Sequence, residues 1–323
     1  MKTSDFEYEL PEELIADRPP DERGQSRMMV VNRAEGTIEH KKFTDLQDYL
    51  QQGDLLVLND TRVVPARYFS NDGKIELLRV AKLSMTKWQC MVKPGKRMKL
   101  GRTVEIGEAT GTVESILENG DRVIQFDGEV DEEKFGHLAL PHYMGRDDDE
   151  VDRERYQTVY NRHEGAIAAP TAGLHFTPEI LAEFDHAFVT LHVGVGTFQP
   201  VRVDEVEDHV MHSEQFVLGE EVVDKIAGAQ RVVSIGTTVS RVLEHCGQQG
   251  DLVAQQGATD IFIYPPYSFK VVDVMLTNFH LPGSTLLMMV SAFAGKDLVR
   301  EAYEQAIENE YRFYSYGDCM LIL

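Results

Sequence analysis

An apolar run at residues 28–32 and a more polar run at residues 37–43 flank a turn-forming Ala-Glu-Gly at residues 34–36. This pattern predicts a hairpin of two strands. A short helix is predicted over residues 45–50, because a threonine suited to capping it comes directly before. The continuous apolar run at residues 54–58 is typical of a strand that is covered on both faces.

The pattern changes between residues 65 and 141. Here the apolar residues form short alternating runs that are separated by glycines. Runs of this length and spacing indicate a small β-barrel. The predicted barrel strands are residues 74–80, 88–92, 103–106, 111–116 and 122–126.

Beyond residue 156, strand and helix patterns alternate, which favours an α/β layer. Strands are predicted at residues 188–193, 231–235, 261–264 and 271–276, and helices at residues 178–184, 239–245, 285–294 and 297–311. We therefore predict an α/β fold, with a sheet flanked by helices, that is interrupted by an inserted small β-barrel domain. The α/β domain comprises residues 1–64 and 151–323, and the barrel residues 65–150.

Composition agrees with an ordinary globular protein, since 42% of the 323 residues are hydrophobic and 27% are charged. No apolar run approaches the ~18 residues of a membrane-spanning helix. The first ten residues lack the basic start and apolar stretch of a signal peptide, so we expect a cytoplasmic protein without a membrane partner. The cysteines Cys90, Cys246 and Cys319 form no C-x-x-C pair, which argues against a disulfide framework or a thiolate zinc site.

The net charge of −22 argues against a nucleic-acid partner, but the charge is unevenly distributed. Residues 66–102 contain ten basic and two acidic residues, a local balance of +8. A segregated basic region is typical of a surface that binds RNA or another anion, although a solvated barrel surface is the alternative. The candidate RNA contacts are Arg67, Lys93, Lys96, Arg97, Lys99 and Arg102.

Small polar residues follow three of the apolar strands, at residues 59–62, 236–238 and 277–280. Ligands of open α/β sheets collect at the carboxyl ends of strands, so these three tips are expected to line one crevice. The turn Gly236-Thr237-Thr238 also precedes a predicted helix, whose first N–H groups suit a carboxylate or phosphate. A plain turn and cap is the alternative reading of that turn.

Two histidines lie in settings that suit acid/base chemistry. His175 is the only titrating residue in a stretch of small residues, 168–177. His192 is expected to share one strand face with Thr190, ahead of the glycines Gly194 and Gly196. A structural histidine is the alternative in both cases. The Gly-x-Gly turn lacks the third glycine of a dinucleotide site, and the nearby His-x-x-His completes no zinc pattern, so no metal is expected.

Several longer motifs, taken together, resemble the S-adenosylmethionine:tRNA ribosyltransferase-isomerase family nearly from end to end. They are LPEELIA (10–16), GDLLVLNDTRVVPAR (53–67), YQTVY (156–160), AAPTAGLHFT (168–177), VTLHVGVGTFQPV (189–201), MHSE (211–214), GTT (236–238), TNFHLPGSTLL (277–287) and YRFYSYGD (311–318). The family's fold is likewise a sheet-and-helix domain interrupted by a β-barrel. Pro266 departs from the family's usual glycine and puts the local turn geometry in doubt.

The resemblance implies transfer and isomerisation of the ribosyl part of S-adenosylmethionine onto 7-aminomethyl-7-deazaguanine at the tRNA wobble position. Epoxyqueuosine forms, and adenine and methionine are released. S-adenosylmethionine is then a ribosyl-donor substrate, and no metal or redox cofactor is implied. The expected partners are S-adenosylmethionine and tRNA carrying that base, and we expect a monomer.

We hypothesise that His175 and His192 carry the proton transfers, because both lie in polar settings with glycines, and that Asp60 or Asp318 orients or deprotonates the aminomethyl group. Arg62, Thr171 and the turn at residues 236–238 hold the methionine carboxylate, and Phe198 or Phe279 stacks on adenine. The remaining candidates for substrate binding are Asn59, Gly173, Thr190, Gly194, Gly196, Asn278 and His280.

Two other functions use the same features. An S-adenosylmethionine-dependent RNA methyltransferase shares the α/β layer and the cosubstrate, but it leaves S-adenosylhomocysteine. A non-catalytic RNA-binding module built on the basic barrel turns over nothing. Release of adenine that depends on modified tRNA separates all three functions.

Overall fold

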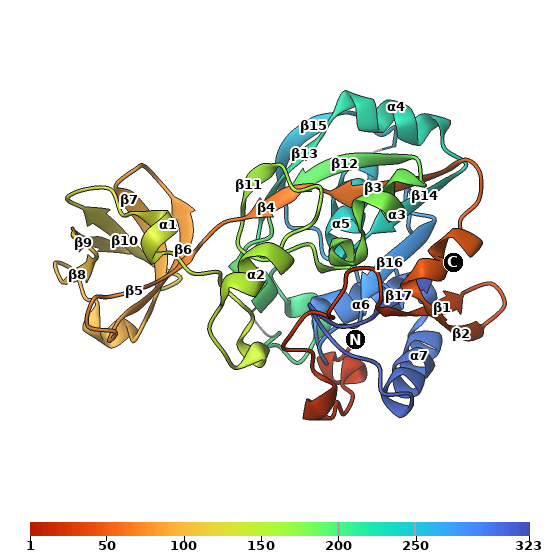
Figure 1. Ribbon diagram of the computed structural model, residues 1–323, viewed down its shortest axis with the longest axis horizontal. Coiled ribbons are helices and arrows are strands. Elements are labelled where there is room, and N and C mark those ends of the chain that lie inside the picture. The colour runs from red at the N-terminus through yellow and green to blue at the C-terminus, as the bar shows by residue number, and fades with distance from the viewer. Residues whose placement is uncertain (199–200, 249) are drawn as a thin grey trace. The chain divides into compact units, whose positions relative to one another are not determined.

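A computed structural model describes residues 1–198, 201–248 and 250–323, without the side chains of residues 197 and 198. The chain forms two compact units (Figure 1). The first comprises Met1–Arg62, His142–Gly145 and Arg155–Leu323, and the second comprises Val63–Pro141 and Arg146–Glu154. The expected domain boundaries at residues 64/65 and 150/151 stay predictions. Within the described ranges, no helix is long and apolar enough to cross a membrane.

A mixed sheet organises the first unit. Over the described residues it has nine strands, in the order β15-β13-β12-β3-β14-β16-β17-β1-β2. Four neighbours, β12, β3, β14 and β16, run parallel, whereas β13 and β17 run antiparallel to them. The strands are β1 Arg27–Asn32, β2 Thr37–Lys42, β3 Asp54–Asn59, β12 His186–Leu191, β13 Glu214–Leu218, β14 Arg231–Ile235, β15 Gln255–Thr259, β16 Val274–Asn278 and β17 Cys319–Ile322.

One edge of this sheet collects several chain segments. The carboxyl ends of the four parallel strands meet there, as parallel pairing requires. Because β13 is antiparallel to β12 and β17 is antiparallel to β16, the first residues of β13 and β17 lie at the same edge. Strand β1 pairs in parallel with β17, so its start lies there too. We call this the carboxyl edge.

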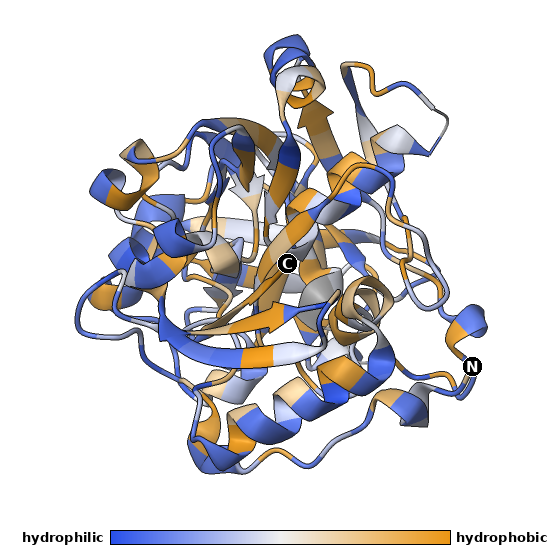
Figure 2. Ribbon diagram, turned by 90° about the vertical axis from the view of Figure 1, so that its right-hand side faces the viewer, coloured by the Kyte–Doolittle hydropathy of each residue, from blue (hydrophilic) through white to orange (hydrophobic). Residues whose placement is uncertain are grey.

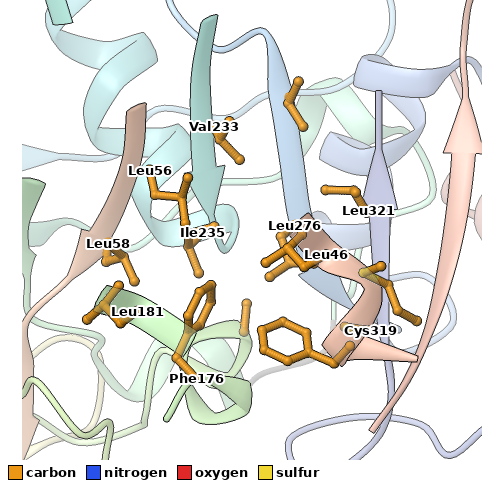
Figure 3. Close-up of a cluster of buried hydrophobic side chains, with 14 of the residues drawn as sticks. Leu46, Leu56, Leu58, Phe176, Leu181, Val233, Ile235, Leu276, Cys319 and Leu321 are labelled. Atoms are coloured by element: carbon orange, nitrogen blue, oxygen red, sulfur yellow. The ribbon is translucent and has the colours of Figure 1, made fainter. Parts of the chain in front are cut away.

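Helices cover both faces of the sheet because alternate strand residues point to opposite sides. Leu56 and Val233 pack with Phe176 in one buried cluster (Figure 3), whereas the adjacent Ser234 hydrogen-bonds to Ser240 on the opposite face. The helices of this unit are α3 Pro178–Ala182, α4 Glu220–Gly228, α5 Thr237–Gly247, α6 Thr285–Ala294 and α7 Lys296–Glu308. Helix α1 Glu132–Phe135 and all of α2 Glu150–Arg155 except its last residue belong to the second unit. Figure 2 shows hydrophobic residues along the strands and mixed hydropathy along the outer helices.

The chain also contains short 3₁₀ helices and a separate two-stranded sheet. The ladder pairs β4 Thr61–Val63 with β11 His163–Ala166. The 3₁₀ helices are η1 Thr3–Phe6, η2 Glu12–Leu14, η3 Phe43–Asp48, η4 Gly95–Arg97, η5 His142–Met144, η6 Thr171–His175, η7 Val195–Phe198 and η8 Val206–Asp208.

The second unit contains an antiparallel, barrel-like sheet. Its strands follow the order β5-β6-β7-β10-β9-β8 around a core that includes Tyr68, Trp88 and Phe126. The Asn71 N–H, just after β5, donates to the Glu105 carbonyl in β8 at 2.9 Å and nearly closes the ring. The strands are β5 Arg67–Phe69, β6 Glu76–Lys82, β7 Lys87–Lys93, β8 Thr103–Ile106, β9 Ala109–Ile116 and β10 Arg122–Phe126.

The structure confirms some of the elements predicted from the sequence and corrects others. The hairpin at residues 28–43 is confirmed, and the helix at 285–294 has the predicted bounds. The run at residues 261–264 forms no strand; Ile261 and Ile263 are buried without joining a ladder. The helix predicted at residues 45–50 is the 3₁₀ helix η3. Strand β12 ends at Leu191, so His192 lies just beyond the strand on which it was expected.

Candidate active site

The carboxyl edge brings together the three predicted polar tips. Asn59 and Asn278 are the last residues of β3 and β16, and Gly236 follows β14. The 3₁₀ helix η6 lies against this edge, since a Cβ added at Gly236 would lie 3.5 Å from the Cβ of Ala172. The prediction that these tips line one place is therefore consistent with the sheet topology.

His175, the last residue of η6, is hydrogen-bonded at both ring nitrogens. Its Nδ1 lies 2.9 Å from Ser26 Oγ, and its Nε2 lies 3.1 Å from Asn278 Oδ1. Asn278 Nδ2 donates to the Tyr314 carbonyl at 2.8 Å, so Oδ1 is the acceptor toward His175. This network assigns the proton to Nε2 and leaves the Nδ1 lone pair to accept from the Ser26 hydroxyl.

The protonation state of His175 follows from its burial. Burial lowers the pKa of His175 to about 4, the hydrogen bond to Asn278 opposes that shift, and the positive charge of Arg23 adds to it. The ring is therefore neutral near pH 7. A neutral imidazole whose Nδ1 carries no proton is suited to accept one once the Ser26 hydroxyl moves away.

A small cavity lies beside this histidine. It is lined by residues that include Ser26, His175, Ser315, Arg23 and Arg155. Its volume of about 20 Å³ suits a single water molecule rather than a nucleoside. Substrate binding at His175 thus requires the lining segments to move.

His192 belongs to a second cluster, at the end of β12. Its Nδ1 lies 2.8 Å from Thr61 Oγ1. Asp60 accepts a hydrogen bond from the Thr190 hydroxyl at 2.7 Å and lies 3.6 Å from His163 Nε2. Partial burial lowers the pKa of His192, the neighbouring His163 lowers it further, and Asp60 raises it. The net effect is a lowered pKa, so this half-buried ring is mainly neutral near pH 7.

Asn59 and Asp318 are held at the edge by backbone groups. Asn59 Oδ1 accepts from the N–H groups of Thr61 and Leu191, and its Nδ2 donates to the Leu191 carbonyl. The Asp318 carboxylate accepts from the N–H groups of Arg27 and Arg312, both at 2.8 Å. Burial raises the pKa of Asp318, and these hydrogen bonds oppose the shift. Both side chains position neighbouring strands.

The residues predicted around adenine have different surroundings. Phe279 is fully buried and packs against Tyr303, Tyr311 and Phe313, so stacking on adenine would require the core to open. The Phe198 side chain lies outside the described residues. His280 Nε2 lies 2.8 Å from Thr277 Oγ1, and burial lowers the pKa of His280 to about 3. Such a histidine stays neutral and structural.

The other predicted binding residues are spread along the same edge. Arg62 is exposed and lies 3.7 Å from the Glu164 carboxylate. Thr171 begins η6, where a Cβ on Gly173 would overlap the Tyr160 hydroxyl. The Gly194 N–H donates to Glu214 Oε1 at 2.9 Å. Gly196 abuts His212, and Thr237 and Thr238 begin α5.

Sequence reasoning missed several side chains that the fold brings to these clusters. They are Ser26, Tyr160, His163 and Ser315, whereas Thr61 belongs to the tip predicted at residues 59–62. Each is a common residue type without a spacing that marks it. Only the structure identifies them, through a bond to His175, a close approach to Gly173 or Asp60, or a place in the lining of the cavity beside His175.

The ten basic residues between positions 66 and 102 fall into two groups. Arg67 pairs with Glu76 and Asp147, which leaves it little free charge. Lys74, Arg79, Lys82 and Lys87 also pair with carboxylates. The basic loop, residues 93–102, carries the rest: Lys93, Lys96, Arg97, Lys99 and Arg102 are exposed, with no ion pair to any residue that the structure describes.

The described side chains were compared with the groupings that hold a metal ion. Among residues 1–198, 201–248 and 250–323, no three His, Cys, Asp or Glu side chains are grouped as metal ligands. That the reaction needs no metal remains a prediction.

Comparison with known proteins identifies the family to which the chain belongs. A family model described as queuosine biosynthesis protein matches residues 3–322. Proteins named S-adenosylmethionine:tRNA ribosyltransferase-isomerase from Halothermothrix orenii and Clostridioides difficile are 49% and 48% identical, over the full length of both chains. The crystal structure of S-adenosylmethionine tRNA ribosyltransferase from Thermotoga maritima is 38% identical, with a TM-score of 0.59, and the match covers 99% of this chain and 100% of that one. The chain therefore belongs to the queuosine biosynthesis protein family.

Proposed function

We propose that this protein transfers and isomerises the ribosyl moiety of S-adenosylmethionine onto 7-aminomethyl-7-deazaguanine at the wobble position of tRNA. Epoxyqueuosine is the product, and adenine and methionine leave. The names of the full-length relatives support the reaction class. The observation that carries the proposal is the neutral, hydrogen-bonded His175 at the carboxyl edge of the sheet.

His175 acts as the base in this proposal. The positive sulfur of S-adenosylmethionine acidifies the hydrogens on its 5′ carbon, and Nδ1 of a neutral imidazole accepts one of them. The Ser26 hydroxyl gives up its hydrogen bond to Nδ1 as the substrate enters. Asn278 Oδ1 keeps its bond to Nε2–H, 3.1 Å away, and so stabilises the imidazolium that forms.

His192 acts as the acid. Departing adenine takes up a proton, and a histidine beside a carboxylate can hold one to donate. Burial and His163 lower the pKa of that ring overall, and Asp60, which lies in the His192 cluster, opposes the shift, so His192 takes up its proton before adenine leaves. Two histidines in contrasting environments divide the roles of base and acid between them. Asp60 also orients the incoming aminomethyl group.

The second unit binds the RNA through its exposed cations. Five exposed cations of the basic loop have no carboxylate partner among the described residues, which leaves them available for phosphates. As part of this proposal, the barrel is an inserted domain, and the protein acts in the cytoplasm as a monomer. S-adenosylmethionine serves as substrate, and no metal or redox cofactor takes part.

One assay tests the reaction. The protein is incubated with S-adenosylmethionine and with tRNA that either carries or lacks the aminomethyl base, and the small products are separated. We expect equimolar adenine and methionine with the modified tRNA only. S-adenosylhomocysteine instead of adenine would identify a methyltransferase. No turnover of S-adenosylmethionine at all would leave a binding module.

A further inference from the structure

A buried ion pair lies at the carboxyl edge, outside both histidine clusters. Arg241, in the second turn of α5, places Nη1 2.6 Å from Oε2 of Glu214, the first residue of β13. The exposed fractions of the two side chains are only 6% and 5%. The other carboxylate oxygen of Glu214 accepts the Gly194 N–H at 2.9 Å. The pair therefore links α5 to the loop that follows β12.

The Arg241 guanidinium uses only part of its donor set. Nη1 faces Glu214, but Nε and Nη2 are buried without a hydrogen-bond partner in the described part of the chain. These two groups form one edge of the planar guanidinium, the edge that binds both oxygens of a carboxylate in a bidentate pair. Buried donors left without partners are costly, which makes this edge a place for a ligand.

The surroundings of this edge also favour an anion. Side chains of a helix lean toward its N-terminus, so Arg241 leans toward the first turn of α5. Thr238 lies three residues earlier on the same face of α5, and its Oγ1 is likewise buried without a partner. The positive end of the helix dipole adds to the attraction for negative charge.

We infer that the Nε–Nη2 edge of Arg241 binds the methionyl carboxylate of S-adenosylmethionine, with the Thr238 hydroxyl as a further donor. This inference rests on the proposed function. A carboxylate at the end of a flexible chain fits a site whose arginine is only 6% exposed, whereas a phosphate within an RNA backbone does not. Glu214 fixes the guanidinium from the opposite side. Binding of the methionyl carboxylate, which was predicted from the sequence for the exposed Arg62, is thus assigned to Arg241.

The test compares two ligands that differ in the carboxylate. S-adenosylhomocysteine retains the amino-acid end, and 5′-methylthioadenosine lacks it. We expect Arg241→Lys, which keeps a charge beside Glu214 but loses the bidentate edge, to weaken S-adenosylhomocysteine roughly 10- to 100-fold. Its affinity for 5′-methylthioadenosine should stay within about twofold. Dissociation constants come from calorimetry on the full chain.

Two further variants keep the result interpretable. Arg300→Lys makes the same exchange at an exposed arginine of α7 and should change neither affinity. If Arg241→Lys unfolds, Glu214→Gln with Arg241→Gln removes both buried charges and should show the same selective loss. An equal loss for both ligands, or no loss, would overturn the carboxylate assignment alone. A wild-type chain that binds neither ligand would overturn the proposed function as well.

Discussion

The His175 cluster and the basic loop place polar groups in opposite ways. His175 is buried and neutral, and both of its ring nitrogens are hydrogen-bonded to side chains that are themselves held in place. The basic loop exposes five charges that have no partner among the described residues. The first arrangement fixes one lone pair in one direction, whereas the second presents charge without fixed geometry.

The His175 cluster should therefore affect the rate of the chemical step, and the basic loop the affinity for RNA. A proton transfer depends on atoms held at hydrogen-bonding distance, and losing one such group affects the rate of the chemical step. Contacts between exposed cations and phosphates contribute additively and weaken with salt. Changes in the two places should therefore alter different kinetic constants, and three experiments examine this.

The largest effect is expected from the histidines. His175→Ala and His192→Ala should each lower kcat for adenine release about 10²- to 10⁴-fold, because each removes a proton-transfer group. His186→Ala serves as a matched control, since His186 begins the same strand, β12, that ends before His192, and its ring hydrogen-bonds to the Phe184 carbonyl and to no other described residue. Release at the wild-type rate by both His175→Ala and His192→Ala would show that the acid/base assignment is wrong.

The next effect concerns pH and stability. Because the pKa of His175 is lowered to about 4 in the folded chain from 6.5 when unfolded, the unfolded chain takes up a proton first as the pH falls. The stability contributed by neutral His175 is thus present above pH 6.5 and lost toward pH 4. Urea unfolding at pH 7 and 4.5 should show a fall that is about 2 kcal/mol smaller in His175→Gln than in the wild type. An identical fall in both chains would contradict the buried, neutral state.

The smallest effect is expected in the basic loop. Replacing Lys96, Arg97 and Lys99 together with serine should raise KM for tRNA about tenfold near 0.15 M salt, with kcat unchanged. The plot of log KM against log salt should also become less steep, by about 2. Serine at Lys74, Lys82 and Lys87 is the matched control, because carboxylates already neutralise these lysines. Equal effects from both triple variants would remove the distinction between paired and unpaired cations.

The sequence predicted best those elements whose local pattern was sufficient. Helix α6 has the predicted bounds because a long apolar stretch follows Ser284, whose side chain accepts the Leu287 N–H as an N-cap. Strand β17 was missed, since a run of only four apolar residues does not distinguish a strand from part of a buried helix. Strand β15 was missed because its sequence, QQGAT, has almost no hydrophobic residues to mark a strand. Both depend on pairing with distant strands, which no local window contains.

The same limit applies to the candidate site. His175 and Asn278 stood out from their small and polar neighbours, but Ser26 precedes the hairpin without any distinguishing pattern. It reaches His175 only because β1 pairs with β17. Arg67 was grouped with the other cations, yet it pairs with Glu76 and Asp147, which lie 9 and 80 residues away. Charge counted along a sequence does not reveal which charges neutralise each other.

The position of β17 between β16 and β1 has a consequence for synthesis of the protein. Arg27, at the start of β1, is bonded to Asp318, which lies 291 residues further along the chain. A ribosome must therefore add all of these residues before the β1–β2 hairpin can join the sheet. Until then the hairpin keeps one hydrophobic strand edge without a partner, which is a template for aggregation. Ser26 can reach His175 only after that delay, so the nascent chain should depend on chaperones that shield strand edges.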